Sequence, residues 1–118
     1  MHTQRTGKGA CVEVALASAA GYLALPRAWG LTTPGAAIGG GHAGYQIYRC
    51  KNGRVAVAAL EPHFAARLCA AAGLELAAPQ TMFKPDTQLT IAAWLLGKTR
   101  AQLDKLAAAQ DIPIFTMA

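Results

Sequence analysis

A glycine-rich stretch between Gly30 and Gly44 divides the sequence into two unlike parts. It holds six glycines and one proline, and its apolar residues follow neither helical nor strand periodicity. Such a composition is typical of a linker and marks a domain boundary. We therefore expect two units, residues 1–35 and residues 36–118.

The first unit is apolar but short. Apolar residues alternate from Val12 to Leu16, which predicts a strand, and an Ala/Leu-rich run over 15–29 predicts a helix that Pro26 ends or kinks. One strand and one helix cannot bury each other's apolar surface. We expect this unit to need a sheet or a second copy from outside it.

A β-hairpin is expected at the start of the second unit. Two β-like runs, 45–50 and 54–60, flank the dipeptide Asn52-Gly53. This dipeptide is the strongest short-range hairpin signal in the chain, because both central residues of the favoured two-residue turn have positive φ.

Helices and a final strand follow the hairpin. Pro62 suits a first helical turn and Gly73 suits a helix end, while Asp86 is a candidate cap for the next helix. Thr99 fits a capping box at the start of a third helix. With the apolar run 112–117 as a last strand, the pattern predicts an α+β fold: a small antiparallel sheet packed with about three helices, preceded by the extra N-terminal strand and helix.

The composition limits the class of protein. Hydrophobic residues make up 53% and charged residues 14%, which excludes disorder. The net charge is +5, but the basic residues are scattered. A polyanionic partner and a merely solvated basic surface both fit this charge. No basic stripe with interleaved aromatics is present, so nucleic-acid binding is the weakest hypothesis.

Cysteine usage and the lack of targeting signals indicate a cytoplasmic protein. Cys11, Cys50 and Cys69 are widely spaced and lie in apolar company, so we expect three reduced, buried thiols and no metal site. The polar N-terminus is not a signal peptide, and no run is apolar enough to span a membrane.

Candidate chemistry gathers around Gly39, Gly40, Gly41 and His42. These residues precede a predicted strand, whereas a dinucleotide-binding loop follows a strand and opens a helix. Glycines allow a backbone to approach a ligand closely, so a linker and a flap over a site both remain open.

Glu61 stands at the junction between the second hairpin strand and the predicted helix. It is either an N-cap that gains from the helix dipole or a carboxylate at the mouth of a cleft. Glu61 and His42 are the acid–base groups near the glycines, and the sequence gives no catalytic triad.

Three segments resemble those of class III CoA-transferases. They are RTGKGACVEVAL over 5–16, GYQIYRCKNGRVAVAALEPHFAARLCAAAGL over 44–74 and KTRAQLDKLAAAQDIPIFTM over 98–117. The second segment is closest to the α-methylacyl-CoA racemase branch. The resemblance implies that residues 1–35 are the exit from the family's large domain plus a linker, and that 36–118 are its small α+β domain.

The resemblance also implies roles. The glycines Gly39–Gly41 match the family's active-site flap loosely, with His42 beside them as part of a CoA or acyl-CoA site. Glu61 matches a glutamate near the racemase's catalytic histidine and so lines the active site. No tightly bound cofactor is implied.

The family's nucleophilic aspartate and most CoA contacts precede the first matching segment, and Ala10, Glu13 and Ala17 replace the family's Gln, Asp and Ser. We therefore expect a fragment or split half that is inactive alone and acts on acyl-CoA thioesters when complemented. Expected partners are an upstream half of the enzyme or a second copy in a homodimer that exchanges the N-terminal helix. The rival hypothesis is a non-catalytic, self-associating domain.

Overall fold

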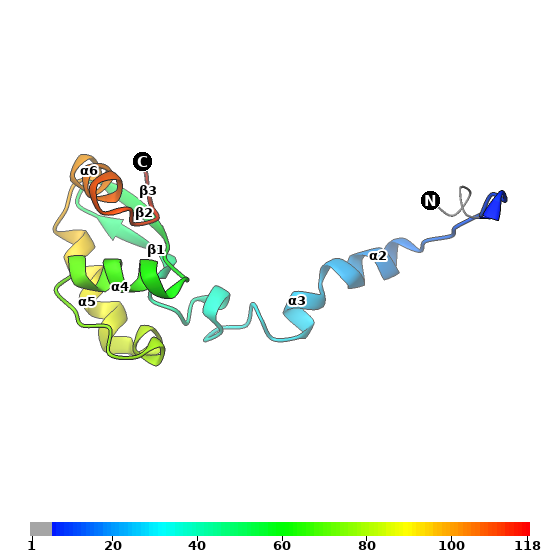
Figure 1. The fold of residues 1–118 in the computed structure, drawn as a ribbon, viewed down its shortest axis with the longest axis horizontal. Coiled ribbons are helices and arrows are strands. Elements are labelled where there is room, and N and C mark those ends of the chain that lie inside the picture. Colours follow the sequence, from blue (N-terminus) through cyan, green and yellow to red (C-terminus); the bar gives the residue numbers. More distant parts are fainter. Residues whose placement is uncertain (1–5) are drawn as a thin grey trace.

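The computed structural model describes residues 6–118 and has two parts, a folded body and an extended arm (Figure 1). The radius of gyration is 20.3 Å and the molecule measures 63 × 27 × 27 Å. A compact chain of this length has a radius of gyration of about 13 Å. The arm accounts for the difference, because it reaches away from the body along the longest axis.

The elements follow in the order α2 (Leu16–Leu23), α3 (Leu25–Ala28), η1 (Ala37–Gly39), β1 (Tyr45–Cys50), β2 (Gly53–Ala58), α4 (Pro62–Ala71), η2 (Pro79–Phe83), α5 (Pro85–Leu96), α6 (Arg100–Gln110) and β3 (Ile114–Met117), where η denotes a 3₁₀ helix. The body is thus an α+β unit with α4, α5 and α6, as the sequence predicts.

The sheet has three antiparallel strands in the order β1-β2-β3. Tyr48 pairs with Val55 across the hairpin, and Val55 pairs with Thr116 of β3. Side chains alternate between the two faces, so Tyr48 and Val55 are buried, whereas Ile47 and Phe115 on the other face are exposed. The helices therefore cover one face of the sheet and leave the outer face open.

The hairpin forms as predicted, but its turn lies one residue earlier than the Asn52-Gly53 signal indicates. Cys50 pairs with Gly53, which leaves Lys51 and Asn52 as the central residues, and neither has a positive φ. Gly53 is needed for a different reason: a Cβ there would lie 2.4 Å from the Met117 carbonyl oxygen.

Contacts with the start of α6 explain the shift of the turn. The Lys51 N–H donates to the Lys98 carbonyl at 2.8 Å, and the Asn52 Oδ1 accepts from the Arg100 N–H at 2.8 Å. Asn52 thereby satisfies one of the orphan amides at the helix N-terminus.

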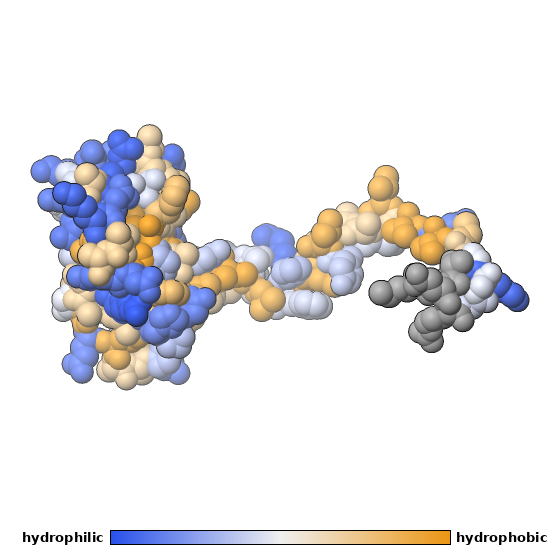
Figure 2. Space-filling model, turned by 45° about the horizontal axis from the view of Figure 1, so that its top comes forward, coloured by the Kyte–Doolittle hydropathy of each residue, from blue (hydrophilic) through white to orange (hydrophobic). Residues whose placement is uncertain are grey.

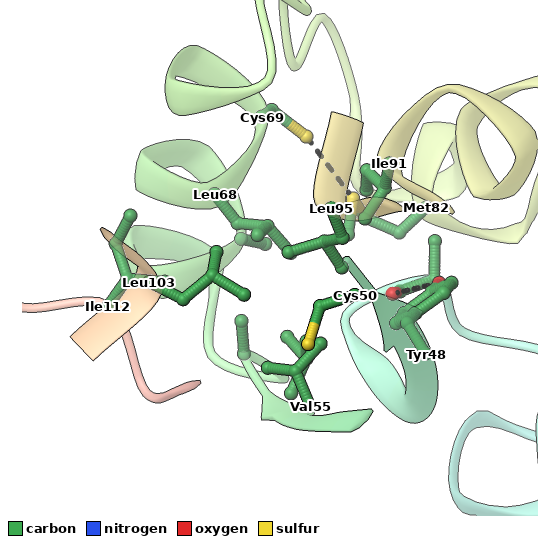
Figure 3. Close-up of a cluster of buried hydrophobic side chains, with 14 residues drawn as sticks. Tyr48, Cys50, Val55, Leu68, Cys69, Met82, Ile91, Leu95, Leu103 and Ile112 are labelled. Carbon is green, nitrogen blue, oxygen red and sulfur yellow. Dashed lines mark hydrogen bonds between the residues drawn. The ribbon is translucent and has the colours of Figure 1, made fainter. Parts of the chain in front are cut away.

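A single apolar core joins the sheet to the helices (Figure 3). Its largest fully buried side chains are Leu68 of α4, Met82 of η2, Ile91 and Leu95 of α5, Leu103 of α6, Val55 of β2 and Cys69. The Cys69 Sγ lies 3.5 Å from the Met82 Sδ, and burial raises the pKa of this thiol. Cys50 and Cys69 are buried free thiols as expected, but Cys11 is exposed, because nothing in the described chain packs against the arm around it.

Most helix ends follow the local signals. Gly73 follows α4 with φ +75°, and the N–H groups of Gly73 and Leu74 close a Schellman motif on the carbonyls of Ala70 and Cys69. The capping box forms at α6, where the Thr99 side chain accepts from the Gln102 N–H.

The predicted cap of α5 is wrong. Lys84 occupies the N-cap position and Asp86 lies in the first turn, because Pro85 takes the first helical position. Asp86 still lies where a carboxylate is stabilised by the helix dipole.

The arm departs from the prediction at its start. Val12 to Ala15 form no strand, since no other strand in the described chain pairs with them, and α2 begins at Leu16. The predicted helix is broken at Ala24, two residues before Pro26, into α2 and α3. Neither helix buries a residue, and Figure 2 shows apolar side chains along the arm.

Among the described residues, no helix has the length and apolar character needed to cross a lipid bilayer.

Candidate functional site

A cavity of about 250 Å³ lies between the end of the glycine-rich segment and the junction of β2 with α4. Ala37 and His42 form one side, and Leu60 and Pro62 form another. The remaining lining residues come from α4 and the segment around η2: Ala65, Leu76, Pro79, Met82 and Phe83. Among all these residues, His42 alone has a nitrogen or oxygen in its side chain. The cavity is thus an apolar chamber with one polar group.

The three glycines before His42 form a tight turn. A Cβ on Gly39 would lie 1.9 Å from the Thr33 carbonyl oxygen, and a Cβ on Gly41 would lie 2.0 Å from the Gly35 carbonyl oxygen. Gly40 has a φ of +103°, which strongly favours glycine. Each glycine therefore has a reason for its identity within the chain itself.

Hydrogen bonds fix this turn to the body. The Gly41 N–H donates to the Ala36 carbonyl at 2.9 Å, and the Gln46 Nε2 donates to the Gly40 carbonyl at 2.7 Å. Gln46 belongs to β1, so the first strand of the sheet holds the glycine turn beside the cavity.

Residues 42–44 connect the glycine turn to the core. The Ala43 N–H donates to the Met82 carbonyl at 2.8 Å, and the Tyr48 hydroxyl donates to the Ala43 carbonyl at 2.6 Å. The Ala59 N–H donates to the Gly44 carbonyl at 2.7 Å. Burial raises the pKa of Tyr48 to about 12, so the phenol remains a donor at neutral pH. Three separate elements thus determine where His42 lies.

His42 is buried, with 6% of the residue's surface exposed. Its Nδ1 accepts a hydrogen bond from the Gly44 N–H at 3.0 Å, and the ring meets Phe83 edge to face with 5.1 Å between centroids. Burial lowers the pKa of His42, because the imidazolium loses hydration there. The histidine is therefore neutral at pH 7.

Glu61 occupies the N-cap position of α4, which agrees with one of its two predicted roles. Its carboxylate makes no capping hydrogen bond, however, and the residue is exposed. It stands between Leu60 and Pro62, both of which line the cavity. Glu61 itself does not line the cavity, and its carboxylate is not used by the helix.

Of the predicted site residues, the structure places only His42 in the lining of the cavity. Gly39–Gly41 precede His42 in the chain and Glu61 lies between Leu60 and Pro62, but none of these four residues lines the cavity. Sequence reasoning missed Met82 and Phe83, which η2 brings to the cavity. The proline at the start of η2 was a weak signal for a turn there, but only tertiary packing shows which way its side chains point.

A second, more open concavity of about 380 Å³ lies over the outer face of the sheet. It is lined by Ile38, Tyr45, Gln46, Ile47, Ala56, Val57 and Ala58. Arg49 and Arg54, which are paired across the hairpin, are exposed beyond its lining. The basic groups of the hairpin thus lie outside the cavity beside His42.

Comparison with curated proteins finds no match. The family model described as CoA-transferase family III matches residues 1–117, which is nearly the whole chain. This match spans the arm, the glycine turn and the body. The chain therefore belongs to CoA-transferase family III.

Proposed function

We propose that this chain supplies the small domain of an enzyme that acts on acyl-CoA thioesters. The reaction is the transfer of CoA between carboxylic acids or, as in the racemase branch, the inversion of a 2-methylacyl-CoA. The observation that carries the proposal is the apolar cavity between His42 and the Glu61 junction, in a chain that belongs to CoA-transferase family III.

The cavity fits one part of such a substrate. An apolar cavity of about 150 Å³ is enough to bind benzene, and this one measures about 250 Å³. An acyl group or the end of the pantetheine arm has the matching size and polarity. The lining contains no cation, so it does not suit the phosphates of CoA. Those groups would be held at another surface.

Two features that adjoin lining residues in the sequence have roles in this proposal. The turn of Gly39–Gly41 shields the acyl group from water on one side. Glu61, with its carboxylate free of the helix, orients the histidine base that the racemase branch uses. None of the three aspartates Asp86, Asp104 and Asp111 lines the cavity, so the family's nucleophilic aspartate is proposed to come from a large-domain segment.

The arm supports a role for a partner. The chain exposes 8126 Å², whereas a compact monomer of 12.2 kDa exposes about 6,000 Å². The excess exceeds the roughly 800 Å² that each partner buries in a standard interface. Val12, Leu16, Leu23 and Trp29 contribute to it. We propose that a large-domain half, or the arm of a second copy, covers this surface in the cytoplasm.

Calorimetric titration of the purified chain with isobutyryl-CoA and with CoA tests the function. We expect micromolar binding of isobutyryl-CoA and weaker binding of CoA, because only the former places an acyl group in the cavity. Leu76→Trp narrows the cavity and should weaken binding at least about tenfold, or 1.4 kcal/mol. Leu96→Trp, an exposed site on α5, is the matched control. Equal binding by both variants, or no binding by a folded chain, contradicts the proposal.

A second candidate is a non-catalytic domain that associates with itself, and the exposed arm favours it. Sedimentation at micromolar concentration distinguishes the two. A dimer that dissociates when Leu16 and Leu23 are changed to Ser, without affinity for isobutyryl-CoA, supports this candidate. A monomer contradicts it.

A further inference from the structure

The tautomer of His42 follows from its contact with Gly44. The Nδ1 accepts the Gly44 N–H, so this nitrogen carries a lone pair and no proton. A neutral imidazole then carries its single proton on Nε2. The ring can therefore donate a hydrogen bond from Nε2 to an acceptor. Its one lone pair, on Nδ1, is already used by the Gly44 N–H, so the ring has none left to bind a metal.

The donor has no partner within residues 6–118. Among the described residues, none accepts a hydrogen bond from the His42 Nε2. Among the described residues, the fully buried side-chain nitrogen that lacks a hydrogen bond is the Arg100 Nε, in another part of the body. The His42 Nε2 is therefore not fully buried. The His42 Nε2 thus retains access to the space that its ring lines. A ligand in this space that carries an acceptor would satisfy the donor, so the cavity favours such a ligand.

The chemistry of the walls restricts that acceptor. Every other lining side chain is apolar, and no cation faces the cavity. A carboxylate or a phosphate would lose its hydration there without gaining an opposite charge. A neutral carbonyl oxygen on an apolar chain satisfies the donor and fills the remaining space.

The ring is also held in place. Phe83 contacts it edge to face at 5.1 Å, and Ala43, next in the chain, is fixed by the Met82 carbonyl on its N–H. Its donor therefore has a defined direction before any ligand arrives, which reduces the ordering cost of binding.

We propose that the Nε2–H of His42 donates a hydrogen bond to the carbonyl oxygen of an acyl thioester whose apolar part occupies the cavity. The inference rests on the proposed function, since it assigns the recognition of the acyl group to the same cavity. It makes His42 a binding residue that distinguishes a thioester from a group without the carbonyl.

The test compares two probes that lack the nucleotide: the S-isobutyryl thioester of N-acetylcysteamine and the corresponding S-isobutyl thioether. Long-range ¹H–¹⁵N spectra of the imidazole rings report the tautomer of the unchanged chain. We expect the Nε2–H tautomer in the free chain and a downfield shift of the Nε2 proton with the thioester alone. The thioester should bind about three- to tenfold more tightly than the thioether.

Variants distinguish the contribution of the His42 donor to binding from that of the apolar cavity. His42→Phe should remove the preference for the thioester, whereas His42→Gln, which retains an N–H donor, should keep part of it. His63→Gln, at an exposed histidine in the first turn of α4, is the control. If His42→Phe does not fold, the spectra of the unchanged chain still test the tautomer and the proposed hydrogen bond.

Three outcomes overturn the inference. An Nδ1–H tautomer in the free chain removes its basis. Equal binding of thioester and thioether overturns the inference and leaves the proposed function standing. If the folded chain binds neither probe and does not bind isobutyryl-CoA, both the inference and the proposed function are overturned.

Discussion

The backbone N–H of Gly44 donates a hydrogen bond to the Nδ1 of His42, two residues earlier, at 3.0 Å. This contact fixes a neutral histidine in the wall of the cavity. Protonation of Nδ1 would break the bond and bury a charge, and burial accordingly lowers the pKa of His42.

The first prediction concerns stability at mildly acidic pH. Because the native pKa of His42 is below its ordinary value of about 6.5, the unfolded chain binds a proton that the native chain does not. This contribution to the free energy of unfolding should fall as the pH drops through about 6.5, by at most about 1.4 kcal/mol per pH unit, and level off below the native pKa. Urea unfolding at several pH values measures it. His42→Gln should remove this contribution, and His63→Gln should retain it; the same pH dependence in His42→Gln would contradict the assignment.

The second prediction concerns the Tyr48 hydroxyl, which donates to the Ala43 carbonyl. Tyr48→Phe should lower the free energy of unfolding by about 1 kcal/mol, because it leaves a buried carbonyl unpaired. Tyr45→Phe, on the outer face of the same strand, should change little.

Alkaline unfolding supplies a further check on Tyr48. Its native pKa is raised from about 10 to about 12, so the unfolded chain releases the proton first and stability should fall as the pH rises above about 10. This part of the pH dependence should be absent from Tyr48→Phe. If the loss of stability above pH 10 persists in Tyr48→Phe, its assignment to the Tyr48 hydroxyl is wrong.

The third prediction concerns the glycine turn. Gly39→Ala places a methyl group 1.9 Å from the Thr33 carbonyl, so the turn must open. Amide hydrogen exchange at Gly41, whose N–H donates to Ala36, should accelerate, while exchange in the β1–β2 hairpin stays unchanged. Gly21→Ala, where the added methyl group contacts nothing, is the control and should stabilise α2. Unchanged protection of Gly41 in Gly39→Ala would show that the turn is not packed as described.

The fourth prediction concerns the link between the hairpin turn and α6. Asn52→Ala removes the acceptor for the Arg100 N–H and should cost about 0.5–2 kcal/mol of stability. Asn52→Asp keeps an acceptor oxygen at a helix N-terminus and should preserve stability. Chemical denaturation of the two variants measures both, and equal stability of the Ala and Asp variants would contradict the contact.

Features of the sequence that act locally predicted the fold well. Gly73 ends α4 through its own positive φ, and Thr99 caps α6 through a neighbour three residues away. The turn at Asn52 was placed one residue late because its position depends on Lys98 and Arg100, which are distant in the sequence. The strand at Val12 was wrong because alternation of apolar residues specifies a strand only where a partner strand exists.

The candidate site was predicted only in part. Residue type singles out His42 and Gly39–Gly41, and its position at a strand–helix junction singles out Glu61, but of these residues only His42 lines the cavity. The cavity that His42 lines depends on the chain path after Gly73, which brings Met82 and Phe83 into the same lining. No periodic pattern in the sequence predicts the path of this segment. The burial of His42 likewise depends on Phe83 and Gly44 together.

The proposed binding of the acyl group is tested most directly by a methyl NMR titration of the chain, labelled with ¹³C-methyl methionine, with isobutyryl-CoA. Met82 lines the cavity, whereas Met117 lies on β3, outside the lining, and serves as an internal control. The proposed function predicts a saturable shift of the Met82 methyl signal with little change at Met117. An unchanged Met82 signal, or a shift confined to Met117, would show that the cavity beside His42 does not bind the acyl group.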